Sequence, residues 1–403
     1  MSTPRAVAVG ALAAAAVAIT LAAPAAAQPE PTADAPQVIA HRGSGGTSPE
    51  NTVASFRDGR TSRAEFFEID VQLSADGVPF LFHDADGGRT TDVAEVFPDR
   101  AEDPITSFTW DELSQLDAGS YFGVQYTGER IPHLNDAAAQ ARGNIGVNVE
   151  IKSPESSPGV EQVLAEAIAT ERHWQRLLES DRLVVSSFDE ESLRTFHELA
   201  PEVPLLQVGE VPDDATLASW AEFATTVVTN YRTLDPADVA RVHDAGLALS
   251  VYTANAPEAW AQLTDLGVDS IITDFPAALV RFQRGAAPVP AANGIEVADV
   301  VADVPGPDLT PEVGEHVVLT NTSDRAIDVS GYVLQDAVIH RLVVGEGYVI
   351  PPGGELRVYT GPGTNTDTAY YNDYGANVLN NNGDSIAVMR PMPSLVLLDL
   401  YAY

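Results

Sequence analysis

Hydrophobic residues follow two alternating patterns between residues 37 and 284. Short apolar runs typical of strands are separated by stretches in which apolar positions recur every three or four residues, as on one face of a helix. The strand-like runs cover 37–42, 66–73, 78–83, 146–152, 182–187, 203–209, 226–230, 247–253 and 270–274. Parallel strands need long crossovers, usually helices, so this alternation predicts an α/β fold, a (β/α)₈ TIM-type barrel.

The number of strand-like runs exceeds the eight of such a barrel by one. The connection Ser74–Gly77 is too short for a parallel crossover. The second and third runs therefore pair as a hairpin, or one of them lies outside the barrel, and both readings stay open. Among the helices, Thr109 opens a capping box, and Asp189 and Asp235 are suited to N-caps.

The pattern changes after residue 286. Residues 287–294 are rich in proline and alanine and are typical of a linker. From residue 295 to 403 helical periodicity ends, and short alternating runs are separated by Gly, Pro and Asn turns. This pattern predicts a small all-β, immunoglobulin-like sandwich.

The first 27 residues have the form of a secretory signal peptide. Arg5 provides a positive charge, a run of small apolar residues follows, and Ala25–Ala27 offers a cleavage site. The alternative is a retained membrane anchor. Residues 28–36 read as a short linker, and no later stretch is apolar and long enough to span a bilayer. We therefore expect a secreted, extracellular or cell-envelope protein without an integral membrane segment after cleavage.

The charge balance argues against several partners. Across 403 residues, 58 acidic and 22 basic side chains give a formal net charge of −36, which repels nucleic acid and anionic membranes. The absence of cysteine excludes disulfides and thiolate metal sites. Lys152 is the only lysine, so its position deserves a test.

Chemically capable side chains stand in or at the ends of three strand-like runs. His41 and Arg42 end the first run, Glu68 and Asp70 stand in the second, and His83 ends the third. Residues i and i+2 of a strand share one face, so the two carboxylates point the same way. Paired carboxylates suit a hard divalent cation, two histidines suit a general acid and a general base, and an arginine suits a phosphate.

A fourth run adds Glu150 and Lys152, again on one face. Glu150 is a candidate third metal ligand and Lys152 a candidate phosphate contact. Together these residues predict metal-assisted phosphoryl transfer. Which histidine is the acid stays open. Ca²⁺ and Mg²⁺ both accept oxygen ligands, and secretion favours Ca²⁺.

The motifs also carry a family resemblance. They are H-R-G at 41–43, P-E-N-T at 49–52, E-x-D at 68–70, H-D at 83–84 and E-x-K at 150–152. In this order they resemble the glycerophosphodiester phosphodiesterase family, over residues 37–286. The resemblance implies hydrolysis of glycerophosphodiesters to glycerol phosphate and an alcohol by two-histidine acid–base catalysis. Tyr252 and His133 replace the family's common tryptophan and threonine, which we interpret as changes to the substrate pocket.

The C-terminal region resembles a lamin-tail domain. This resemblance favours a scaffold or adhesion module, with a cell-envelope polymer as a candidate partner. Alternatives for the barrel are a phospholipase D-like or phosphoinositide phospholipase-like enzyme, a teichoic-acid phosphodiesterase, and a non-catalytic envelope-binding protein. Glu50 and Asn51 either orient the His41 loop or act directly.

Overall fold

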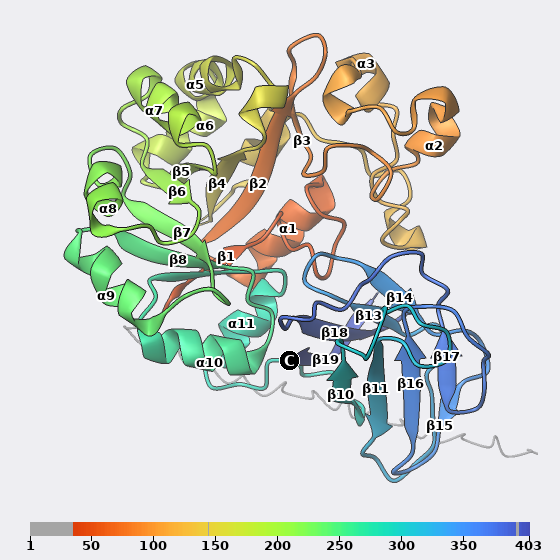
Figure 1. Cartoon of the computed structure of the whole chain (residues 1–403). Coiled ribbons are helices and arrows are strands. Elements are labelled where there is room, and N and C mark those ends of the chain that lie inside the picture. Colours follow the sequence, from red (N-terminus) through yellow and green to blue (C-terminus); the bar gives the residue numbers. More distant parts are fainter. Residues whose placement is uncertain (1–34, 144, 392–394) are drawn as a thin grey trace, which may run out of the picture.

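The computed structural model describes residues 35–143, 145–391 and 395–403. The expected signal peptide, residues 1–27, and nearly all of the expected linker 28–36 lie outside these ranges. Figure 1 shows two parts, a strand barrel surrounded by helices and a C-terminal region of β-sheets. In the part of the chain that is described, no helix has the length and apolar character needed to cross a membrane.

Eight parallel strands form a closed barrel, because β1 pairs with both β2 and β9. The strands are β1 (Gln37–Ala40), β2 (Phe66–Leu73), β4 (Gly146–Ile151), β5 (Leu183–Ser187), β6 (Leu205–Val208), β7 (Thr226–Asn230), β8 (Ala248–Tyr252) and β9 (Ser270–Thr273). Their side chains and those of the surrounding helices form one large apolar core. The predicted (β/α)₈ barrel is confirmed.

The third strand-like run, 78–83, is the one in excess of eight, and it forms β3 (Pro79–Leu81). It pairs antiparallel with β2, with Val71 opposite Leu81, and it lies outside the closed ring. The tight turn is closed by the Ser74 amide, which donates to the Val78 carbonyl at 3.0 Å. Both readings left open by the sequence are therefore true of this run.

Helices cover the outside of the barrel, mostly one after each strand (Figure 1). They are α1 (Val53–Ser62), α4 (Leu134–Gln140), α5 (Val160–Thr170), α6 (Arg172–Glu179), α7 (Glu190–Leu199), α8 (Asp214–Trp220), α9 (Pro236–Asp244), α10 (Pro257–Leu266) and α11 (Pro276–Gln283). Two short helices, α2 (Val93–Val96) and α3 (Trp110–Leu113), pack with β3 around a separate small core. Thr109, Asp189 and Asp235 cap helices as expected.

The described residues of the C-terminal region form two four-stranded sheets and a two-stranded one. The first has the order β10 (Ile295–Val301), β11 (His316–Asn321), β16 (Glu355–Tyr359), β17 (Ala369–Tyr371). The second has the order β14 (Arg341–Val343), β13 (Val333–Gln335), β18 (Ser385–Arg390), β19 (Val396–Ala402), and β12 (Ile327–Asp328) pairs with β15 (Val349–Ile350). The predicted all-β region is confirmed.

The second sheet is buried on both faces. On β18, Ile386 and Val388 enter the core of the C-terminal region, whereas Ala387 and Met389 join the core cluster of the barrel. Successive residues of a strand point to opposite faces, so a strand covered on both sides needs a continuous apolar run. This sheet therefore packs directly against the barrel.

Candidate active site

A cavity of about 240 Å³ opens at the carboxyl ends of the barrel strands, where barrel enzymes hold their chemistry. All seven side chains singled out from the sequence line it. They are His41, Arg42, Glu68, Asp70, His83, Glu150 and Lys152. Strand-end position and the alternation of side chains along β2 together predicted that these residues meet.

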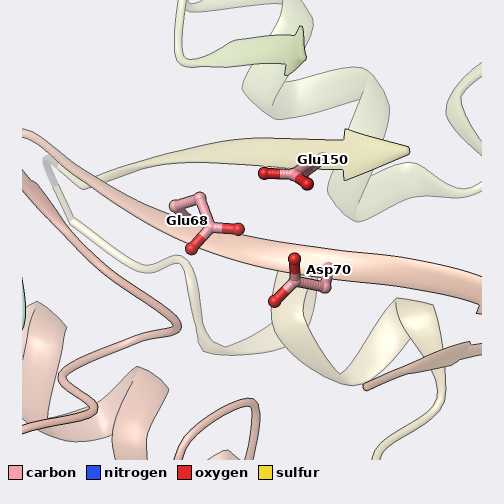
Figure 2. A group of neighbouring side chains, drawn as sticks. All are labelled: Glu68, Asp70 and Glu150. Atoms are coloured by element: carbon pink, nitrogen blue, oxygen red, sulfur yellow. The ribbon is translucent and has the colours of Figure 1, made fainter. Parts of the chain in front are cut away.

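Three carboxylates form the acidic side of the cavity (Figure 2). Glu68 and Asp70 stand two residues apart on β2, and Glu150 stands on the neighbouring strand β4, opposite Asp70 in the parallel register. One oxygen from each can be chosen so that all three lie within 4.8 Å of one another. The strand period and the β2–β4 register together create this cluster.

The contacts of Glu68 suit a ligand of a divalent cation. Its Oε2 accepts a hydrogen bond from the Arg42 amide at 2.8 Å, while its buried Oε1 has no hydrogen-bond partner among the described residues. Burial, followed by the charges of Asp70 and Glu150, raises the pKa of Glu68 well above its usual value. A divalent cation would supply the missing partner and offset the crowded negative charge. When bound there, such an ion supplies Lewis-acid polarisation of a phosphoryl oxygen.

Two cationic side chains border the carboxylates. Lys152 Nζ lies 3.0 Å from Glu150 Oε1 and 3.6 Å from Asp70 Oδ1, and Arg42 Nε lies 3.8 Å from Asp70 Oδ2. Burial alone would raise the pKa of Asp70, but nearby positive charges, that of Lys152 foremost, outweigh it and lower the pKa. The cavity floor therefore carries both signs of charge, as a bound metal and a phosphate require.

Each cavity histidine is held by a carboxylate through Nδ1. His41 Nδ1 lies 2.7 Å from Asp274 Oδ1, and His83 Nδ1 lies 2.7 Å from Asp84 Oδ1. The other oxygen of buried Asp274 accepts from Asn255 Nδ2 at 2.6 Å. An ionised carboxylate only accepts, so each Nδ1 carries the proton that it donates to its aspartate, and Nε2 is the ring atom left for proton exchange with a substrate.

Arg89 connects the two histidine loops. It donates from Nε to Asp84 Oδ2 at 2.6 Å and from Nη1 to Glu50 Oε2 at 2.6 Å, while Arg42 Nη1 donates to Glu50 Oε1 at 2.7 Å. Glu50 is buried, which alone would raise its pKa, but the charges of Arg42 and Arg89 hold it down to about 2. These contacts favour an orienting role for Glu50, which fixes Arg42.

Asn51 and His133 also have contacts that indicate orienting or capping roles. Asn51 Nδ2 donates to Asp70 Oδ2 at 2.7 Å, which holds that carboxylate in place. His133 caps α4, its Nδ1 accepting from the Asn135 amide at 3.0 Å. Tyr252, in contrast, lines the cavity together with Phe188. Of the two departures from the family pattern, the tyrosine is thus the one that lines the cavity.

Sequence reasoning did not assign roles to Asp84, Arg89, Asn255 or Asp274. Asp84 and Asp274 carried a usable signal, because each ends or directly follows a strand-like run, as the predicted site residues do. Arg89 had none, since its partner Glu50 lies 39 residues away and the contact exists only in the folded chain.

The barrel fold, the carboxylate cluster, the two histidines and the two cationic side chains together define a class of protein. It is the class of barrel enzymes equipped for hydrolysis of phosphate esters. Within it, the chain belongs to the glycerophosphoryl diester phosphodiesterase family, whose family model matches residues 41–278, more than half of the chain. The Lamin Tail Domain family model matches residues 288–403.

Individual relatives agree. A glycerophosphodiester phosphodiesterase of Bacillus subtilis is 28% identical over 261 residues, which cover 62% of this chain and 86% of the relative. One of Caldanaerobacter subterraneus subsp. tengcongensis is 33% identical and covers 61% and 97%. A solved Oleispira antarctica phosphodiesterase in complex with the product sn-glycerol-3-phosphate has a TM-score of 0.55 and 31% identity, with 62% and 96% covered.

Proposed function

We propose that this chain is a secreted, divalent-metal-dependent glycerophosphodiester phosphodiesterase that uses His41 and His83 as its acid–base pair. The observation that carries the proposal is the pair of imidazoles in one cavity, each held through Nδ1 by a carboxylate at 2.7 Å. Each is thereby oriented with Nε2 available for proton transfer. Secretion is supported by the signal-like residues 1–27.

The remaining cavity residues have complementary roles in this proposal. Glu68, Asp70 and Glu150 hold the metal ion, and Arg42 and Lys152 hold phosphate oxygens. Ca²⁺ is favoured over Mg²⁺, because all three candidate ligands are carboxylates and a secreted enzyme meets abundant Ca²⁺.

The histidines divide the proton transfers. One removes a proton from the nucleophile, which is water or a neighbouring hydroxyl of the substrate, and the other protonates the leaving alkoxide. Attack at phosphorus forms the new P–O bond, and the bond to the alcohol breaks. Attack by water gives glycerol phosphate and a free alcohol directly, whereas attack by the neighbouring hydroxyl gives the alcohol and a cyclic phosphate, which water then opens to glycerol phosphate.

The test measures glycerol phosphate released from glycerophosphocholine, with Ca²⁺, with Mg²⁺ and with chelator, by the wild type, His41→Ala and His83→Ala. His243→Ala is the matched control, because His243 also pairs with an aspartate, Asp269, at 2.8 Å but does not line the cavity. We expect metal-dependent release that both cavity variants lose and the control keeps, with metal affinity nearly unchanged. Substantial activity in His41→Ala or His83→Ala refutes the acid–base assignment.

A further inference from the structure

A loop of the C-terminal region closes one side of the catalytic cavity. This loop, which we call the 336–340 loop, consists of residues 336–340 and connects β13 with β14. Two of its residues, Ala337 and Val338, line the same cavity as His41 and His83. The cavity wall is therefore built from both parts of the chain.

Contacts within the loop hold its shape. The buried Asp336 carboxylate accepts from the amides of Val338 at 3.1 Å and His340 at 2.7 Å, and from His340 Nδ1 at 2.8 Å. Ile339 is buried and has a φ of 69°, a conformation rare for a β-branched residue. Such a backbone conformation persists only where the surrounding contacts hold it, so the 336–340 loop has a defined shape.

Contacts with the barrel fix where the loop lies. A Cβ built on Gly45, in the loop that follows His41, would stand 3.1 Å from Ile339 Cδ1, so Ile339 packs against the histidine loop. Just beyond the loop, Arg341 Nη1 donates to the Phe122 carbonyl at 2.8 Å, and its guanidinium lies 3.7 Å from the centre of the Phe122 ring. Such stacking suits the planar guanidinium. The loop is therefore anchored to the barrel at two points, the loop after His41 and the segment around Phe122.

The loop adds apolar surface to the cavity. Val338 is 54% exposed and Phe188 is 53% exposed, and both line the cavity, where Phe188 contacts the Tyr252 ring edge-on with centroids 6.1 Å apart. Large apolar side chains left exposed beside a charged site indicate a surface that a ligand covers. The charged floor suits the phosphate, so the apolar wall is left for an organic group of the substrate.

We propose that Val338 of the C-terminal region is a specificity-determining residue, which limits the size of the alcohol esterified to glycerol phosphate and so selects small, soluble glycerophosphodiesters. The inference rests on the proposed function. The C-terminal region is thereby a working part of the active site. A cavity of about 240 Å³ with a fixed wall favours small substrates over polymers and aggregated lipids.

The test compares full-length wild type, Val338→Ala and Val338→Trp on glycerophosphoethanolamine, glycerophosphoinositol and lysophosphatidylglycerol, whose esterified alcohols are ethanolamine, inositol and monoacylglycerol. Val313→Trp is the matched control, because Val313 is an exposed valine (62%) of the same region that does not line the cavity. We expect Val338→Trp to lower kcat/KM for glycerophosphoinositol about tenfold more than for glycerophosphoethanolamine. Val338→Ala should shift the preference toward the larger alcohols.

Metal affinity and melting temperature should stay unchanged in these variants, which separates a lost contact from a misfolded protein. Equal effects on all three substrates, or kinetics like those of Val313→Trp, would overturn this inference alone. A wild type that prefers lysophosphatidylglycerol would overturn it too. If the wild type released glycerol phosphate from none of them, the proposed function would fall and this inference with it.

Discussion

Replacement of Asp274 by asparagine tests how the buried carboxylate controls His41. Asn255 Nδ2 donates to one Asp274 oxygen at 2.6 Å, so the oxygen of the new amide should face Asn255 and its NH₂ group should face His41 Nδ1. The His41 proton is then forced onto Nε2, where the ring can no longer accept one. The side-chain volume hardly changes, so the effect is on the tautomer rather than on packing.

The expected loss of kcat in Asp274→Asn can be estimated if His41 is the base that accepts the proton of the nucleophile. A base in the wrong tautomer costs about 10²- to 10⁴-fold in kcat, or about 3 to 5.5 kcal/mol in activation free energy. KM should change little, because Asp274 does not line the cavity. The assay is steady-state release of glycerol phosphate, together with the melting temperature and the metal affinity.

Asp84→Asn is the matched comparison at the second histidine. Arg89 donates to both Asp84 oxygens, at 2.6 and 3.0 Å, so the new amide places its NH₂ group against a donor of Arg89 whichever way it turns. Oδ1 also accepts from His83, so the amide oxygen is expected to stay on that side and the NH₂ group to face Arg89 Nε. Asp84→Asn therefore weakens the hold on His83 without changing its tautomer, and we expect a smaller loss of kcat than in Asp274→Asn. If Asp274→Asn keeps kcat within about threefold of wild type while folded, carboxylate control of the tautomer is refuted.

Three further predictions concern the metal site and the stability of the fold. Glu68→Gln should weaken divalent-metal affinity by about tenfold or more, since it removes one charge from the carboxylate cluster, and titration calorimetry showing unchanged affinity would count against the site. Gly43→Ala should lower the free energy of unfolding in urea by about 2 kcal/mol or more, because Gly43 has a φ of 91° and a Cβ there would overlap Ser55; an unchanged urea midpoint would contradict this. Asp117 accepts hydrogen bonds from three backbone amides and, although burial opposes it, these bonds lower its pKa to about 2. Because this pKa is lower in the folded than in the unfolded state, the ionised Asp117 stabilises the fold above about pH 4, and the stabilisation is lost as pH falls toward 2. Wild type should therefore be more stable than Asp117→Asn by on the order of 1 kcal/mol near neutral pH, since the group is partly exposed, and this difference should shrink between pH 5 and 3. A difference in unfolding free energy that stays constant over this pH range would refute the role.

The alternation of side chains along a strand predicted the cluster of acidic residues from the sequence. Glu68 and Asp70 share a face because strand residues alternate, and Glu150 joins them because parallel strands of a barrel end at one rim. The apolar spacing of residues 159–179 is helical throughout, yet Glu171 is extended (φ −89°, ψ 125°) and separates α5 from α6, a break that the spacing alone does not predict.

The sequence by itself determined the barrel, the all-β region and the seven candidate site residues, because periodicity and strand-end position are local properties of the chain. The tertiary structure alone decided the partners of those residues. His41 meets Asp274 across 233 positions and Glu50 meets Arg89 across 39, and neither separation leaves a local pattern. The same holds for Val338, which reaches the cavity only because the second C-terminal sheet is apolar on both faces and packs against the barrel.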